Sequence, residues 1–325
     1  MREARRLDLA SPATEELFAC SRLLEEAWKR ASEAGRLAYD PARALFCEAA
    51  PLRFLYLPGR QTRPRARISP EARISLRRPH VHCAFDSQTF LDEREAFRAG
   101  RQGRNYHLVF NKYPVLPLHF LAVRAAWEPA ETLPQTIHGA AELEDMLLLA
   151  TSLGPPFHLV FNSNRGADGS LSGSSVNHWH FQIFPWSWGP AEDALRLEAS
   201  GGEVERGAAI GWPAHHALFR SRSACALAES LWSSIERITR QDSAFNLEIV
   251  PLSDRSLLAF LFHRAPVGDL VLPDGSQLSK DFGGFELTGG VVVPTQQGFE
   301  WVTQNQREAV ALVFERLMSS TIAGP

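Results

Sequence analysis

The segment NHWHFQIFPW, residues 177–186, alternates polar and large apolar side chains, and it restricts the fold more than any other feature of the sequence. Side chains two residues apart lie on the same face of a β-strand. The alternation therefore predicts a strand with one polar and one apolar face. The polar face would carry His178, His180 and Gln182, and the apolar face Trp179, Phe181 and Ile183. A half-buried strand that faces water remains the alternative explanation.

The overall composition is typical of a globular protein. The chain has 325 residues, 45% of them hydrophobic and 22% charged, with a formal net charge of -3. This balance gives no sign of a protein that coats nucleic acid or a membrane surface, and no segment has the length and apolarity of a membrane span. The cysteines are too widely spaced for a disulfide scaffold. We therefore expect a cytoplasmic protein with neither nucleic acid nor membrane as a partner.

Periodicity along the chain predicts an α+β fold. The expected helices cover residues 11–35, 139–154, 224–238 and 304–318, the last with Thr303 as N-cap. The expected strands cover 52–57, 106–110, 119–123, 156–163, 244–252, 256–264 and 283–293, in addition to the opening segment. Strand, helix and strand recur in both halves, although His-x-His occurs only in the first. The pattern predicts two related lobes, 1–200 with the N-terminal helix and Arg-rich segment, and 201–325 without the His motif.

Three segments resemble the histidine-triad superfamily, and within it the nucleotidyltransferase branch. Residues 178–182 match the His-x-His-x-Gln of the transferases, whereas the hydrolases carry a third His. The run NKYPVLPLHFLAV, residues 111–123, is similar to a run of the diadenosine tetraphosphate phosphorylases. VFNSN, residues 160–164, is similar to the strand that precedes their phosphate loop. The matches lie in the expected order within about residues 75–190, which makes the combined signal stronger than any single motif.

The resemblance implies an antiparallel sheet flanked by helices, with nucleotidyl transfer as the activity. His180 would attack the α-phosphorus and hold the nucleoside monophosphate covalently, since neutral imidazole is a ready nucleophile. The main-chain carbonyl of His178 would orient the His180 ring. Gln182 can hydrogen-bond phosphoryl oxygens but cannot supply a proton, which favours transfer to phosphate or a sugar phosphate over hydrolysis.

The implied donor is a dinucleoside polyphosphate or a nucleoside-diphosphate sugar, and the resemblance allows a homodimer formed through a sheet edge. A hydrolase that uses the same His180 is one alternative. A nucleotide-binding sensor without catalysis is another.

Small residues before the strand form a candidate phosphate pocket, because they let backbone amides approach an anion. The candidate substrate-binding residues are Asn162, Ser163, Gly173, Ser174, Ser175 and Lys112. An exposed strand-end lysine is an equal alternative for Lys112, and solvation is the alternative for each arginine between Arg53 and Arg78. Trp186 and Trp188 are candidates for stacking on a base, against burial in the core. His107, His119 and His158 are expected to be strand residues without a catalytic duty.

The segment RRPHVHCAFD, residues 77–86, raises the question of a metal. Galactose-1-phosphate uridylyltransferases carry Cys-x-x-Cys here, which binds zinc together with the first His of the catalytic strand. The corresponding residues of this chain are His80, Cys83 and His178, and His82 or Glu128 would serve as a fourth ligand. A structural His/Cys turn without zinc is the alternative. Mg²⁺ is a second candidate, since it screens phosphate charge, although no carboxylate cluster requires it.

Overall fold

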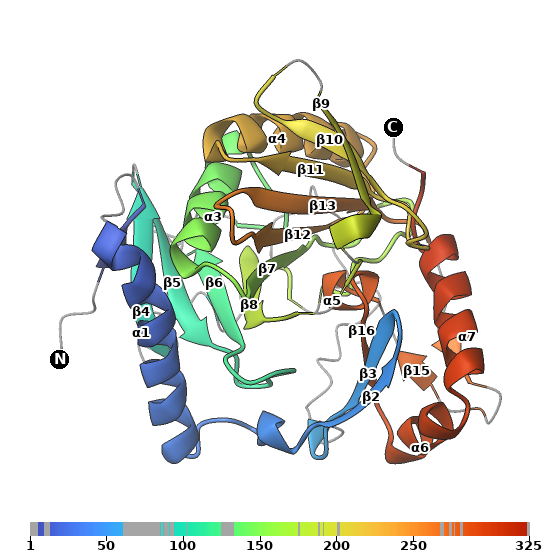
Figure 1. Ribbon diagram of the computed structural model, residues 1–325. Coiled ribbons are helices and arrows are strands. Elements are labelled where there is room, and N and C mark those ends of the chain that lie inside the picture. The colour runs from blue at the N-terminus through green and yellow to red at the C-terminus, as the bar shows by residue number, and fades with distance from the viewer. Residues whose placement is uncertain are drawn as a thin grey trace.

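In the computed structural model the chain folds around a large β-sheet (Figure 1). The structure describes residues 6–9, 14–60, 85, 87, 91, 94–101, 103–124, 133–174, 176–187, 189–190, 192–199, 202–266, 270–272, 275, 277–279 and 282–323.

Within these residues the large sheet has eleven strands. In spatial order they are β1 (Arg6–Asp8), β4 (Glu95–Arg101), β5 (Arg104–Phe110), β6 (Phe120–Arg124), β8 (His180–Pro185), β7 (Phe157–Asn162), β12 (Phe245–Pro251), β13 (Leu257–His263), β11 (Ala217–Ser221), β10 (Glu205–Ala209) and β9 (Leu195–Ala199). Neighbours pair antiparallel, except that β1 pairs parallel with β4, so the predicted purely antiparallel sheet is mixed at that edge.

The strand order repeats between the two halves. The first half contributes the order 4-5-6-8-7, the second the order 9-10-11-13-12, and the halves join where β7 pairs with β12. Along the chain, a long helix follows the third strand of each set. α3 (Ala140–Leu153) lies between β6 and β7, and α4 (Ala224–Arg240) lies between β11 and β12. This arrangement is consistent with the predicted tandem of related lobes, whose boundary at residue 200 stays a prediction.

Helices cover one face of the large sheet because that face is continuously apolar. Residues of α1 (Thr14–Glu33), α3 and α4 share one hydrophobic cluster with the inward side chains of the strands. Trp179, Phe181 and Ile183 belong to this cluster and are fully buried, which confirms the predicted apolar face of the opening segment.

A second layer covers the other face of the sheet. A three-stranded sheet, in the order β16 (Gly290–Val293), β3 (Leu52–Tyr56) and β2 (Leu45–Ala49), shares a hydrophobic cluster with α6 (Gln296–Gln304), α7 (Gln306–Ser319) and β13. In Figure 1 this small sheet lies below the large one, beside α6. It contains strands from both sides of residue 200, because β16 pairs parallel with β3. The short elements that complete the fold are α5 (Gly284–Leu287), β14 (Leu270–Val271), β15 (Gln277–Ser279) and two 3-10 turns, Pro41–Arg43 and Glu192–Ala194.

Two predicted elements near the C-terminus are wrong in detail. Only residues 290–293 of the predicted strand 283–293 are extended, because its first part forms α5. The predicted helix 304–318 is two helices, α6 and α7, and Asn305 between them is the N-cap of α7. Thr303 lies inside α6, where its hydroxyl donates to the carbonyl of Glu300 (2.7 Å). The apolar periodicity continues across the joint, so it could not reveal the break.

Candidate active site

The histidine pair lies at the start of β8, near the middle of the large sheet. The strand begins at His180, three residues later than the alternation predicts, and pairs with β6 on one side and β7 on the other. His180 and Gln182 face away from the helices, on the face that the small sheet covers. His178 is fully buried and His180 is almost so. The ring of Phe85 covers both imidazoles, with centroid distances of 5.6 Å to each.

The His180 ring is oriented by the backbone of its own strand. Its Nδ1 lies 2.8 Å from the carbonyl oxygen of His178, the contact that the resemblance implies. A carbonyl can only accept a hydrogen bond, so Nδ1 must carry the proton, and Nε2 then holds the lone pair. Burial lowers the pKa of His180 from 6.5 to about 4. The imidazole is therefore neutral at pH 7, in the form that can attack phosphorus.

This depressed pKa makes the stability of the protein depend on pH in a defined direction. Between pH 6.5 and pH 4 the unfolded chain binds a proton at this histidine while the folded chain does not, so stability is lost as the pH falls through that window. Comparing urea unfolding of wild type and His180→Gln, we expect the wild type to lose about 2 to 3 kcal/mol more than the variant between pH 7.5 and pH 4.5. An equal loss in both proteins would contradict the neutral buried form.

A buried carboxylate supports β8 from the helical side. His178 Nε2 donates to the carbonyl of Arg124 at the end of β6 (2.8 Å). The Arg124 guanidinium in turn pairs with Glu142 in the first turn of α3. Glu142 also accepts from the indole N–H of Trp179 (3.1 Å), the residue between the two histidines. The three contacts fix β8 to β6 and to α3 around the histidine pair.

Asn162 connects the site to the second half of the chain. Its side-chain oxygen accepts hydrogen bonds from Asn246 Nδ2 (2.7 Å) on β12 and from the backbone N–H of Gly284 (2.9 Å) at the start of α5. Asn246 also donates to the carbonyl of Ser172 (2.8 Å) in the Ser/Gly loop. Residues of both predicted lobes therefore hold the predicted phosphate loop beside the end of β7.

The candidate loop residues differ in what their side chains do. The hydroxyl of Ser163 is used within the fold, since it accepts from Phe245 N (2.7 Å) and donates to the carbonyl of Asn164 (3.1 Å). The hydroxyl of Ser174 donates to the carbonyl of Val176 (3.0 Å) and shapes the loop. Ser175 lies outside the described residues. What these contacts leave for a phosphate is mainly the backbone of the loop.

Gly173 gives the sharpest test of this loop. It has a φ of +81°, and a Cβ added to it would lie 2.8 Å from Gly283 Cα and 2.9 Å from Gly283 N. Backbone stands on both sides of the clash, so the loop must move to accommodate Gly173→Ala. We expect the affinity for a nucleoside monophosphate, measured by calorimetry, to fall about tenfold or more.

A matched control separates strain from displacement. Gly154 at the end of α3 has a φ of +67° with nothing within 4 Å of its would-be Cβ, so Gly154→Ala adds strain alone. Its expected cost is about 1 to 3 kcal/mol of stability with unchanged affinity, because ψ is 177°. Equal affinities of the two variants would show that the loop does not contact the nucleotide.

The remaining candidates lie farther from His180. Gln182 is half-buried on the same face, two residues along β8. Lys112 follows β5, whose last residue, Phe110, lies in the row of Phe120 and Ile183. This row is about 10 Å from His180 along β8, and Lys112 comes two residues after Phe110. Its Nζ lies 5.9 Å from the centroid of the Tyr113 ring.

Trp186 packs on Phe285 in the core, with a centroid distance of 4.6 Å, and Trp188 lies outside the described residues.

His107, His119, His158 and the described arginines of the Arg-rich segment make contacts within the fold. His107 contacts Glu95, His119 accepts from the backbone N–H of Val115 (3.0 Å), and His158 lies 2.5 Å from Glu248. Of the Arg-rich segment, the described members are Arg53, which lies over the ring of Phe46, and Arg60, which donates to the hydroxyl of Tyr39.

The structure tests the zinc prediction only at His178, since His80, His82, Cys83 and Glu128 lie outside the described residues. Among the residues that the structure describes, no three His, Cys, Asp or Glu side chains gather to hold a metal ion. His178 donates from Nε2 to a carbonyl, which leaves Nδ1 as the nitrogen with the lone pair. Metal-bound histidines commonly have this arrangement, so His178 fits the predicted role. Zinc and magnesium both stay predictions.

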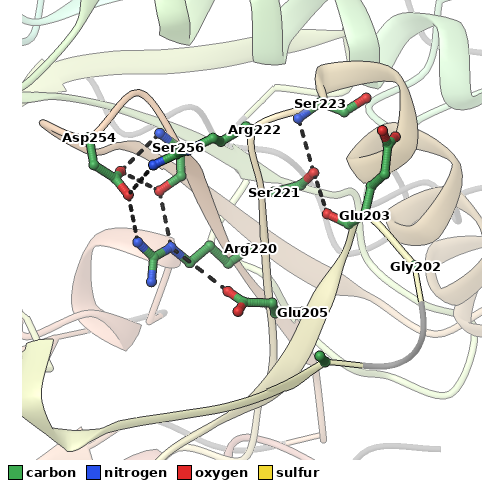
Figure 2. A pocket seen from close by; sticks show the side chains of 10 residues that line it. Gly202, Glu203, Glu205, Arg220, Ser221, Arg222, Ser223, Asp254 and Ser256 are labelled. Atoms are coloured by element: carbon green, nitrogen blue, oxygen red, sulfur yellow. Dashed lines mark hydrogen bonds and ion pairs between the residues drawn. The ribbon is translucent and has the colours of Figure 1, made fainter.

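A cavity lies elsewhere, in the second half of the chain (Figure 2). Its volume is about 680 Å³, and its walls come from β9 to β11, the start of α4 and the turn before β13. The charged groups in it pair with one another, as Arg220 does with Asp254 (2.7 Å), and Ser221 donates to the carbonyl of Glu203 (2.8 Å). The cavity shares no lining residue with the histidine site.

Sequence reasoning missed Gln135 and Phe85, which contact His180, and Glu142, which contacts Trp179 between the two histidines. Gln135 and Glu142 follow no spacing rule relative to residues 178–182, and Phe85 belongs to the segment considered only for metal binding. The signal that could have indicated the first two is a polar residue amid apolar neighbours, as in LPQTI, residues 133–137. A buried polar side chain needs partners.

The chain resembles known proteins in its sequence family and in its fold. A family model described as a domain of unknown function, DUF4922, matches residues 24–185. No curated protein matches the sequence significantly. The crystal structure of yeast Ap4A phosphorylase Apa2 is similar, with 15% identity and a TM-score of 0.64 over 93% of this chain and 97% of that chain.

The same yeast enzyme in complex with Ap4A has 16% identity and a TM-score of 0.61, over 93% of this chain and 96% of that chain. In complex with AMP it has 15% identity and a TM-score of 0.61, over 94% and 96%. This likeness shows that the chain has the fold of the yeast enzyme. No helix of the described part of the chain is long and apolar enough to cross a membrane.

Proposed function

We propose that this chain is a nucleotidyltransferase that acts by phosphorolysis on a dinucleoside polyphosphate through a nucleotidyl-histidine at His180. The observation that carries the proposal is the state of His180. Its ring is neutral and its Nδ1 is bonded to its own strand, so the Nε2 lone pair is the nucleophile. The fold that this chain shares with a phosphorylase of Ap4A supports the choice of donor.

In the first step the Nε2 lone pair attacks the α-phosphorus and forms a P–N bond. The P–O bond to the distal phosphates breaks, and the distal part leaves with the electron pair. In the second step an oxygen of inorganic phosphate attacks the same phosphorus, the P–N bond breaks, and nucleoside diphosphate and neutral His180 result. Gln182, on the same face of β8, would hydrogen-bond the transferred phosphoryl group, and backbone amides of the Ser/Gly loop would offset the negative charge of that group.

Nucleoside-diphosphate sugars are a second class of donor, with a sugar phosphate as acceptor, because the same two steps transfer their nucleotide. The decisive experiment is intact-protein mass spectrometry after incubation with nucleoside triphosphates, dinucleoside polyphosphates or nucleotide sugars. We expect an acid-labile mass increase of one nucleoside monophosphate, discharged by phosphate. Tight nucleotide binding without an adduct from any donor would overturn the proposal and favour the sensor.

The identity of the acceptor distinguishes a transferase from a hydrolase. Turnover that depends on added phosphate and yields nucleoside diphosphate supports the transferase, whereas release of nucleoside monophosphate at the same rate with and without phosphate supports a hydrolase. Zinc bound through His80, Cys83 and His178, a cytoplasmic location and a homodimer remain parts of the same proposal, and metal analysis of the purified chain tests the first.

A further inference from the structure

β7 and β8 separate at the catalytic histidine. Their antiparallel register runs from Phe157 opposite Pro185 to Val160 opposite Gln182 and ends there. Continued by two residues, it would place Asn162 opposite His180. Asn162 instead pairs only with Asn246 of β12 on its other side. The backbone N–H and carbonyl of His180 therefore point into a gap where the neighbouring strand would have been.

The side chain of Gln135 fills this gap. Its Oε1 accepts from His180 N (2.8 Å), while its Nε2 donates to the carbonyls of His180 (2.9 Å) and Asn162 (2.9 Å). One carboxamide thus makes to His180 the paired donor and acceptor contacts that a strand backbone would make. Gln135 is fully buried, so water cannot replace these contacts.

The main chain of Gln135 holds both ends of the Ser/Gly loop. Its N–H donates to Asn177 Oδ1 (3.0 Å), just before the histidine pair, and its carbonyl accepts from Asn164 N (2.7 Å), just after β7. Gln135 therefore contacts the loop at its start, the loop at its end and the backbone of the proposed nucleophile. Displacement of any one of these changes the distance between His180 and the loop amides.

From these contacts we infer that Gln135 is a positioning residue for catalysis, which fixes His180 relative to the loop that would bind the transferred phosphoryl group. It does not touch substrate, because every polar atom of its side chain is used within the protein. The expected change in the rate of adduct formation rests on the proposed function. The expected displacement of His180 does not.

Gln135→Glu tests the inference because it preserves size and all main-chain contacts. A carboxylate accepts from His180 N but cannot donate, so it would face two carbonyl oxygens without a hydrogen between them. We expect the rate constant of adduct formation at saturating donor to fall about 10- to 100-fold. The dissociation constant for a nucleoside monophosphate should change by less than about threefold, since uniform binding is not affected.

Thr321→Val is the control for stability. Thr321 is also buried, and its hydroxyl donates to the carbonyl of Leu317 and accepts from His215 N, far along the chain from the site. Its rate constant should stay at the wild-type value although its thermal midpoint falls. Equal slowing in both variants, or a Gln135→Glu variant as fast as wild type, would overturn the inference.

Nitrogen NMR of the histidine rings gives a readout that does not need the reaction. The signals of His180, assigned by their loss in His180→Ala, should shift in Gln135→Glu and stay unchanged in Thr321→Val. If wild type forms no adduct, the proposed function fails while this comparison still decides the inference. The inference would be overturned if the His180 signals of Gln135→Glu were identical to those of wild type.

Discussion

His180→Ala is expected to lower turnover of a dinucleoside polyphosphate by at least about 10⁴-fold, because it removes the nucleophile rather than a binding contact. Among the described residues, the neutral imidazole contacts the carbonyl of His178 through Nδ1 and the ring of Phe85. Nucleotide affinity should therefore stay close to that of wild type. The measurement is phosphate-dependent release of nucleoside diphosphate at saturating donor, with the adduct followed by mass spectrometry in parallel.

His107→Ala is the matched control. His107 is buried on the same sheet face and in the same row, since it lies opposite Val123, which lies opposite His180. Its imidazole contacts Glu95, which Arg98 also holds, so its loss should affect stability and leave the adduct intact. Turnover lost equally in both variants would contradict the assignment of His180, and full turnover in His180→Ala would rule out the covalent route.

The parts of the fold that the sequence could predict are those with a local period. The strand around His180 was predictable because alternation of Trp179, Phe181 and Ile183 with polar residues has one geometric meaning. The same holds for α3 and α4, whose bounds differ from the predicted ones by a few residues. The joint between α6 and α7 was not predictable, because apolar positions keep their spacing through Asn305.

The parts of the site that were missed depend on contacts between distant residues. Asn246 reaches Asn162 across 84 positions and Gln135 reaches His180 across 45. Each is a single amide among apolar neighbours, a pattern that indicates a buried polar group without indicating its partner. The structure shows why an amide is needed at each position: β7 pairs with β12 through Asn162 but stops pairing with β8 before His180.

Glu142→Ala is expected to cost about 3 to 5 kcal/mol of stability and to slow adduct formation as well. Glu142 is buried, and it accepts from the Arg124 guanidinium, from His138 N (2.9 Å) and from the Trp179 indole (3.1 Å). Its removal takes the ion pair from the half-buried Arg124 and leaves the buried indole N–H of Trp179 without its acceptor, which is the costly way to break such a network. Arg124 carries the carbonyl that holds His178, so the histidine pair should move with it.

Asp145→Ala, one turn farther along α3, separates the two effects. Asp145 is fully buried and accepts from Arg104 Nε (2.5 Å) and from the hydroxyl of Tyr106 (2.8 Å), on β5 rather than β8. Its loss should cost a similar 3 to 5 kcal/mol, estimated roughly, by the same mechanism. Urea unfolding gives both stabilities, and single-turnover rates are compared at a temperature where both variants are folded. Slowing confined to Glu142→Ala would show that this carboxylate positions the histidine pair. Equal single-turnover rates in the two variants would show that it only stabilises the fold.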